Sequence, residues 1–358
     1  MKCRIWSARI VCSTIIICAA LVMCELGSAW VHFQHSAERG SALVWSVSRA
    51  FDLWERVKTE SENRAMLGNL SERQVEEALF SPIGATVLDE CEDRYRSSFQ
   101  ALASSIEERN GKIIILYVPS ENFSHAYGRA FFKSLSEKYN IAFVDVTGVF
   151  SAYPREITFL LPVDSHPSRF GHRLIADMLV AALEPLQSHR AFVPSFSSLK
   201  TNGDAVLLGD YPRQMDQIML TNPGIPYRMR TNAQGLRMDR EVPLAPQEQV
   251  VLLLGDSVTS GSSVPVEDIY ATRIANLLSG RIVVNAGVGG YGIEEERDLF
   301  EERMHSMRTD IVVLQVLDND LSAFLWFKTS NRHNNSTKRQ PTKAEQIFIK
   351  EIVTRSVR

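Results

Sequence analysis

Short apolar runs alternate with amphipathic stretches in two separate parts of the chain. In the first part, KIIILYVPS (112–120) and IAFVDV (141–146) predict two buried, parallel strands. Apolar residues between and after them recur at helical spacing, which predicts helices over 125–139 and 170–186. Pro185 marks the end of the second helix.

The same rhythm returns after residue 249. Apolar runs predict three strands there, VVLLL (250–254), RIVVNA (281–286) and DIVVLQVL (310–317). Helical spacing predicts helices over 267–278, 293–304 and 342–357. Short apolar strands that alternate with helices predict an α/β fold built on a parallel sheet.

The remaining segments divide the chain. We expect a signal anchor or transmembrane segment at 1–33, a polar helical lead-in at 34–90 and a first α/β segment at 91–187. A linker and loop-rich lead-in, with several prolines, follows at 188–249, and the second α/β segment with a polar tail occupies 250–358.

The N-terminus has the pattern of a targeting segment. Lys2, Arg4 and Arg9 precede the uncharged run IVCSTIIICAALVMC. This run is shorter than the ~20 residues that span a bilayer, but 26–33 could extend it. An uncleaved anchor with basic residues on its cytoplasmic side predicts that the rest of the chain is periplasmic or extracellular. A cleaved signal peptide is the alternative, because Gly27 and Ala29 suit a cleavage site.

Composition excludes several classes of protein. The 358 residues carry a net charge of −3, which gives no reason to expect nucleic acid. The five cysteines form no CxxC motif and no cluster with histidine, so we expect neither a disulfide framework nor a metal. We expect no cofactor.

The candidate nucleophile is Ser257 in VVLLLGDSVTSG. It directly follows a predicted buried strand, so it should lie at the carboxyl edge of the sheet, where ligand sites of open α/β folds form. Taken alone, Gly-Asp-Ser is also a common turn that caps a helix. Asn319 follows the strand 310–317 and should reach the same edge, although Asp-Asn-Asp also favours a plain turn.

A glycine-rich turn, NAGVGGYG, follows the strand 281–286. Its GxGxxG spacing raises a dinucleotide site as an alternative. Glu294, Glu295 and Glu296 at the start of the next helix disfavour it, because a pyrophosphate needs that positive helix end unopposed. A bare glycine N–H can instead donate to an oxyanion.

These blocks together resemble the SGNH (GDSL) hydrolase superfamily of esterases, lipases and carbohydrate O-acetyl esterases and acetyltransferases. GDSV matches the nucleophile block and gives Ser257, NAGVGG gives Gly290, and LDND gives Asn319. The segment 224–241 also resembles the lead-in of membrane-anchored bacterial members. The resemblance implies a three-layer, flavodoxin-like parallel sheet, with an oxyanion hole formed by Ser257, Gly290 and Asn319.

The acid–base block of the family stands in an unusual place. It is absent after Asn319 and is matched instead by VDSHPSRFGH, which gives the base His166. The family's acid usually lies three residues before the histidine, whereas here Asp164 lies two before it, as in relatives that acetylate exopolysaccharides. Segment 91–187 therefore resembles the second half of such a domain, and 250–358 resembles its first half.

Two explanations of the rotated order are open: one circularly permuted domain, or a rearranged tandem in which His166 and Ser257 belong to two incomplete domains. Each half alone would leave a small parallel sheet with an exposed edge, which favours one composite domain. His166 has an alternative role in a helix-capping loop. We expect His172 to pack or cap locally, and Tyr227 and Arg237 to have surface loop roles rather than to line a groove.

The sequence thus predicts a membrane-anchored, extracytoplasmic serine esterase or O-acyltransferase. Its substrate would be an acylated small molecule or an acylated carbohydrate of the envelope or the extracellular space. The alternative is a catalytically incomplete SGNH remnant that acts as a scaffold or carbohydrate-binding protein, if the two halves do not meet.

Overall fold

The computed structural model describes residues 72–121, 126–162, 164–186, 206–220, 226–243, 246–304, 307–322 and 342–356. All of them belong to the compact unit Ser61–Arg358. The predicted anchor at 1–33 lies outside the described residues. Within the described ranges, no helix combines the length and apolar character needed to cross a membrane.

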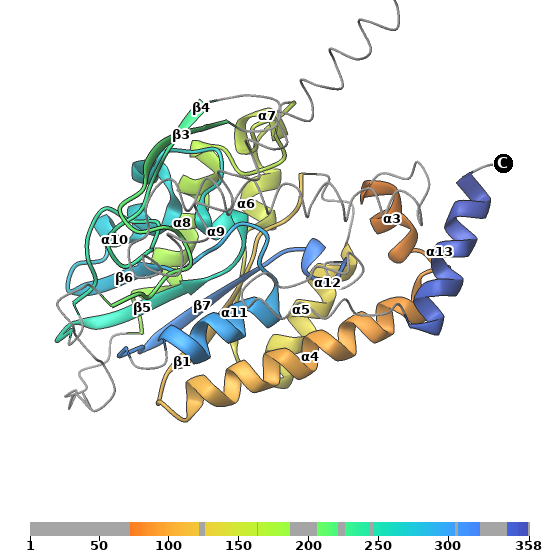
Figure 1. Ribbon diagram of the computed structural model, residues 1–358, viewed down its shortest axis with the longest axis horizontal. Coiled ribbons are helices and arrows are strands. Elements are labelled where there is room, and N and C mark those ends of the chain that lie inside the picture. Colours follow the sequence, from red (N-terminus) through yellow and green to blue (C-terminus); the bar gives the residue numbers. More distant parts are fainter. Residues whose placement is uncertain are drawn as a thin grey trace, which may run out of the picture. The chain divides into compact units, whose positions relative to one another are not determined.

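The centre of the fold is a five-stranded sheet (Figure 1). Its strands are β1 (Lys112–Tyr117), β2 (Ala142–Asp145), β5 (Gln249–Leu254), β6 (Arg281–Asn285) and β7 (Ile311–Val316). They lie in the order β2-β1-β7-β5-β6, and every pair of neighbours is parallel. The predicted parallel α/β sheet is therefore confirmed.

The two halves of the chain share this sheet. β1 from the first half pairs along its whole length with β7 from the second, with Ile114 opposite Val313 and Tyr117 opposite Val316. A single composite domain is thus confirmed, and the alternative of two incomplete domains is wrong. Pairing of β1 with β7 covers an edge that either half alone would expose.

The order of the strands also identifies the kind of sheet. When β5 is counted as the first strand and the chain is followed through β7 and on to β1, the sheet order becomes 2-1-3-4-5. This is the flavodoxin-like order. The connectivity is a rotated version of that fold, as the resemblance implied.

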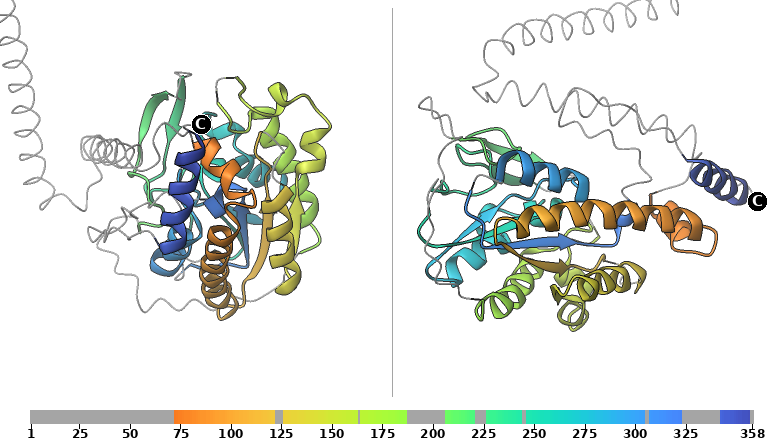
Figure 2. Two further views of the ribbon diagram at one scale, coloured as in Figure 1. Left: turned by 90° about the vertical axis from the view of Figure 1, so that its right-hand side faces the viewer. Right: turned by 90° about the horizontal axis from the view of Figure 1, so that it is seen from below.

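Side chains alternate between the two faces of the sheet and form two cores. Ile113 and Ile115 of β1 point to one face, and Ile114 and Leu116 point to the other. The first face packs against α4 (Ala85–Glu107), α5 (Ala126–Lys138), α11 (Ile293–Leu299) and α13 (Lys343–Ser356). The second packs against α8 (Arg169–Leu183) and α10 (Tyr270–Leu277). The result is a three-layer arrangement (Figure 2).

α4 is an integral part of this layer. The boundary expected at residue 90 falls inside the helix, whose buried face includes Tyr95, Phe99 and Leu102. Tyr95 contacts the rings of Phe131 and Phe132 of α5 edge-on, at 5.7 and 5.1 Å between centroids. The first turns of α4, which fall within the expected lead-in, also contribute Val87 and Leu88 to the core.

Hydrogen bonds show how the rotated chain closes. The Gln249 side chain at the start of β5 donates to the Leu186 carbonyl just after α8, at 2.9 Å. Arg281 at the start of β6 donates to the Leu183 carbonyl, at 2.8 Å. The end of the first half thus lies beside the start of the second. At the other junction, the short helix α12 (Asn319–Ser322) packs against α3 (Glu72–Leu79) and α4.

Some elements were not expected from the sequence. The region 205–249 contains an antiparallel hairpin of β3 (Asp216–Leu220) and β4 (Pro226–Arg230), which forms a sheet of its own. Met219 and Met229 of this hairpin are buried whereas Ile218 is 66% exposed, so the apolar residues do not form the regular alternation that predicts a strand. The remaining elements are short: α6 (Thr147–Ser151), α7 (Arg155–Thr158), α9 (Ser257–Ser260), the 3₁₀ turn Val266–Asp268 and the π turn Phe300–Met304.

Candidate active site

Ser257 is the first residue of α9, directly after the fully buried strand β5. The turn between them requires glycine, because Gly255 has φ +155° and a Cβ there would lie 2.2 Å from Thr259 Oγ1. Asp256 caps the helix by accepting from the Val258 N–H at 2.9 Å. Ser257 Oγ donates to Asp256 Oδ2 at 3.4 Å. The serine is thus held where β5 and β7 meet, at the switch point of the sheet.

The glycine turn after β6 lies against this helix. A Cβ on Gly287 would lie 2.5 Å from the Ser260 nitrogen, so only glycine allows such a close approach. A Cβ on Gly289 would lie 4.0 Å from Ser257 Cβ. The turn and the candidate nucleophile are therefore neighbours, as expected.

Most N–H groups of this turn bond within the protein. The partners of Gly287, Val288, Gly289, Tyr291 and Gly292 are Asn285 Oδ1, the Gly255 carbonyl, Tyr211 Oη, the Val288 carbonyl and Glu295 Oε2. These bonds fix the shape of the turn and occupy those five donors. Gly290 lies in the same turn at φ +85°, and its role as an oxyanion donor stays a prediction.

Asn319 begins α12 after β7 and is exposed between two buried acids. Asp320 accepts from the Leu317 N–H at 2.7 Å. Asp318 accepts from Tyr117 Oη at 2.9 Å and from Ser120 Oγ at 3.4 Å. Burial, and then the charge of Asp318, raises the pKa of the Tyr117 hydroxyl. Asp318, which has no role in the family motif, therefore joins the loops that follow β1 and β7.

Asp164 and His166 form a direct pair. His166 Nδ1 lies 2.5 Å from Asp164 Oδ1, and the His166 backbone N–H donates to the same oxygen at 3.0 Å. Two backbone bonds, from Asp164 N to the Leu160 carbonyl and from Leu160 N to the His166 carbonyl, close the loop. A spacing of two residues thus allows direct contact between the carboxylate and the imidazole.

The pair has opposed pKa shifts. Burial alone would raise the pKa of Asp164, but its bond to His166 and the charge of that ring outweigh burial and lower the pKa to about 2. Burial alone would lower the pKa of His166, but the bond to Asp164 and the charges of Asp164, Asp256 and Glu121 raise it above 6.5. Each group therefore favours the charged form of the other.

Ser263 connects this pair to the nucleophile segment. Its hydroxyl donates to Asp164 Oδ2 at 2.6 Å. Because Ser263 follows α9 directly, the acid–base loop of the first half contacts the loop that continues from Ser257. The structure brings Asp164 and His166 into contact with each other, and places Gly289 beside Ser257.

His172 has the packing role that we expected. It is fully buried, and its Nδ1 accepts from the Tyr270 N–H at 3.3 Å. Its ring stacks on that of Tyr270 with 5.9 Å between centroids. Burial lowers its pKa to about 3, so the ring is neutral.

The expected surface role of Arg237 is wrong. Its side chain is fully buried, and its guanidinium donates to the carbonyls of Ser260, Gly261 and Val264 at 2.5–2.6 Å. The guanidinium also lies 5.5 Å from the ring centroid of Tyr227. Burial lowers the pKa of Arg237. Arginine is stable here because two carbonyls at the end of α9 and the Val264 carbonyl in the loop that follows need donors.

Sequence reasoning missed Ser263, Tyr211 and Asp318. Tyr211 Oη bonds to Ser260 Oγ at 2.7 Å and accepts from the Gly289 N–H at 3.0 Å, so it joins α9 to the glycine turn. The only local signal for Ser263 was its place in the serine-rich GDSVTSGSS. Among the described residues, no group of three or more His, Cys, Asp or Glu side chains is arranged to hold a metal ion.

Comparison with known proteins gives distant structural likenesses only. No family model matches the chain, and no curated protein matches it. The chain is similar to the O-acetyltransferase domain of Pseudomonas putida AlgJ, with a TM-score of 0.44 and 13% identity over 74% of this chain and 91% of that one. It is also similar to Bacillus cereus PatB1, solved with a sulfonyl adduct, with a TM-score of 0.36 and 11% identity over 64% of this chain and 88% of that one.

Proposed function

We propose that the protein is a serine-dependent esterase or O-acyltransferase of the SGNH type. The observation that carries this proposal is the Asp164–His166 pair, bonded through Ser263 to the loop that continues from Ser257. A histidine held by a carboxylate, in a loop bonded to the segment that carries a serine at the end of a buried strand, supports nucleophilic acyl transfer.

The reaction follows from these parts. Ser257 Oγ attacks the acyl carbonyl, and His166 Nε2 takes the proton while Asp164 holds the Nδ1–H and offsets the positive charge. The N–H groups of Ser257 and Gly290, with the Asn319 amide, stabilise the oxyanion, each by roughly 3–4 kcal/mol. His166 returns its proton to the leaving oxygen, which leaves an acyl-serine. Water or an acceptor hydroxyl, deprotonated by His166, then releases the acyl group.

The nucleophile has a direct test. Ser257→Ala should abolish labelling by a serine-reactive phosphonate and hydrolysis of p-nitrophenyl acetate, while circular dichroism and thermal unfolding stay unchanged. Ser151→Ala, which removes an exposed hydroxyl on α6, is the control and should keep both activities. Undiminished labelling of the Ser257 variant would refute the assignment. A folded wild-type protein without labelling would instead support the catalytically incomplete scaffold.

The substrate and the location belong to the same proposal. The Asp-x-His spacing resembles that of relatives that acetylate exopolysaccharides, and the basic, then apolar N-terminus favours a membrane anchor. An acylated carbohydrate outside the cytoplasm fits both. The protein should then remain in membranes after an alkali wash, whereas a soluble form that starts near Trp30 would establish a cleaved signal peptide.

A further inference from the structure

Ser263 has a backbone conformation that serine rarely adopts. Its φ is +69°, in the left-handed region. Ser263 is also nearly buried, with 9% of its surface exposed. A side chain in this region is disfavoured relative to glycine. Such strain persists only where surrounding contacts over-determine it, and it concentrates at functional sites.

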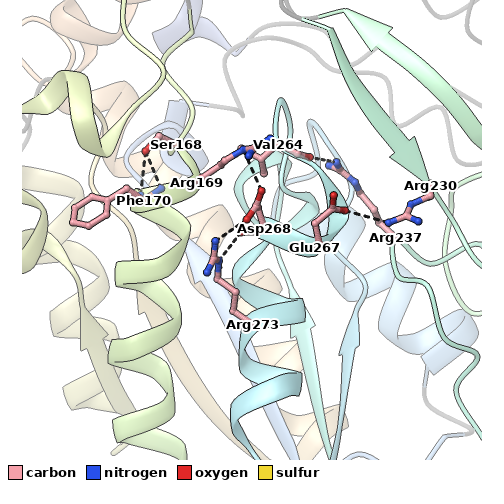
Figure 3. A network of polar contacts seen from close by, with 10 residues as sticks. Ser168, Arg169, Phe170, Arg230, Arg237, Val264, Glu267, Asp268 and Arg273 are labelled. Carbon is pink, nitrogen blue, oxygen red and sulfur yellow. Dashed lines mark hydrogen bonds and ion pairs between the residues drawn. The ribbon is translucent and has the colours of Figure 1, made fainter.

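The surrounding contacts come from Arg237. Its guanidinium bonds to the carbonyls of Ser260 and Gly261 before Ser263 and to the carbonyl of Val264 after it. Figure 3 shows the bond to Val264, with the arginine side chain reaching in from the segment before β5. Hydrogen bonds to Arg237 therefore hold the backbone of the loop both before and after the strained residue.

The side chain of Ser263 forms a hydrogen bond with Asp164. Its hydroxyl donates to Asp164 Oδ2 at 2.6 Å, while Asp164 Oδ1 accepts both hydrogen bonds from His166. One carboxylate oxygen thus faces the base and the other faces Ser263. With both oxygens bonded, the carboxylate cannot rotate without breaking a hydrogen bond.

We infer that Ser263 is a positioning residue of the proposed acyl-transfer site, whose hydroxyl fixes Asp164 so that Asp164 orients His166. This inference rests on the proposed function. It explains why serine occupies a conformation that glycine would adopt without strain: glycine has no hydroxyl for Asp164. It also links the two halves of the rotated chain, because the bond joins the loop after α7 to the loop after α9.

Two substitutions separate the hydroxyl from the strain. Ser263→Ala removes the hydroxyl and keeps the unfavourable φ, whereas Ser263→Gly removes both. Each should lower kcat for p-nitrophenyl acetate about tenfold, as expected for loss of one hydrogen bond to a charged group, with KM within about twofold. Ser263→Gly should melt at a higher temperature than Ser263→Ala. Thr272→Val removes a hydroxyl that donates to the Val266 carbonyl and is the control, with unchanged kcat.

A positioning role also predicts non-additivity. In an Asp164→Asn background, Ser263→Gly should cause no further loss of kcat, because the carboxylate that it orients is gone. An equal loss in both backgrounds, or full activity of Ser263→Gly in the wild-type background, would overturn the inference.

A readout without activity keeps this test separate from the proposed function. Loss of the Ser263 bond should raise the pKa of Asp164 from about 2, measured in the full-length protein by carboxyl NMR with Asp164→Asn for assignment. His166, Asp256 and Glu121 are the charged groups that couple to this pair, and all remain in the variant. An unchanged Asp164 titration would overturn the inference even in an active protein. A raised pKa in a protein without Ser257-dependent labelling would show that Ser263 fixes Asp164 but would refute the proposed function.

Discussion

At the scale of single residues, Asp164 controls the charge of His166. In the proposed mechanism His166 must be neutral to accept the proton of Ser257, and its pKa lies above 6.5 because the effect of Asp164 exceeds that of burial. The rate of phosphonate labelling should therefore rise with pH through a midpoint above 6.5.

Asp164→Asn tests this control. The midpoint should move down, because burial then acts with less opposition, and the rate at its plateau should fall by about 10³–10⁴-fold. Asp177→Asn removes a carboxylate from the exposed side of α8, where it pairs with Arg173, and should leave the profile unchanged. A midpoint that is the same in Asp164→Asn and the wild type would contradict the pairing.

The same pair gives stability a pH dependence with a defined sign. Asp164 has a folded pKa of about 2 against an ordinary 3.8, so its contribution is complete above 3.8 and is lost as the pH falls towards 2. His166 has a raised pKa, so its contribution is present below 6.5 and is lost as the pH rises through the folded value.

At the scale of elements, α4 is a core helix that begins within the expected lead-in and continues into the first α/β segment. Phe99 is fully buried and packs edge-on against Tyr139 at 5.2 Å between centroids. Phe99→Ala should lower the free energy of unfolding by about 3–5 kcal/mol, because it leaves a cavity between two layers. Gln100→Ala, on the exposed face of the same helix, should change it by less than about 0.5 kcal/mol. Urea unfolding with an unchanged m-value measures both, and a similar midpoint for the two variants would contradict a core role for α4.

At the scale of the whole molecule, the two halves depend on each other because β7 lies between β1 and β5. A fragment 206–358 would expose one whole edge of β7 and the apolar surface covered by α4. It should not unfold cooperatively by itself. Addition of fragment 61–190 should restore cooperative unfolding and phosphonate labelling.

A rearranged chain provides the positive control. Residues 206–322 followed, through a short linker, by 72–186 have the usual family order, and contacts of α12 with α3 bring the new junction together. This chain should fold and label at a rate similar to that of the wild type. A fragment 206–358 that unfolds cooperatively without its partner would contradict a composite domain.

Sequence by itself located the strands of the parallel sheet and selected the residues of the candidate site. Periodicity reflects burial on one or both faces of an element, and so it located all five strands of the parallel sheet and the helices α5, α8, α10, α11 and α13. It did not locate α4. Residue type and spacing selected Ser257, Asp164 and His166, because acyl transfer needs a nucleophile, a base and an acid. The rotated order was also visible, since the acid–base block precedes the nucleophile block.

Only the tertiary structure decided which segments meet. Pairing of β1 with β7, the bond from Ser263 to Asp164 and the bridge by Tyr211 join residues far apart in the chain, and no local pattern encodes such contacts. Arginine is a residue type usually found at the surface, and the burial of Arg237 follows from the carbonyls of Ser260, Gly261 and Val264 in and after the last turn of α9. Local sequence shows which residues of an element are buried, because buried positions recur at the period of a helix or a strand. The hydrogen-bond partners of a buried polar side chain depend instead on which loops the sheet brings together.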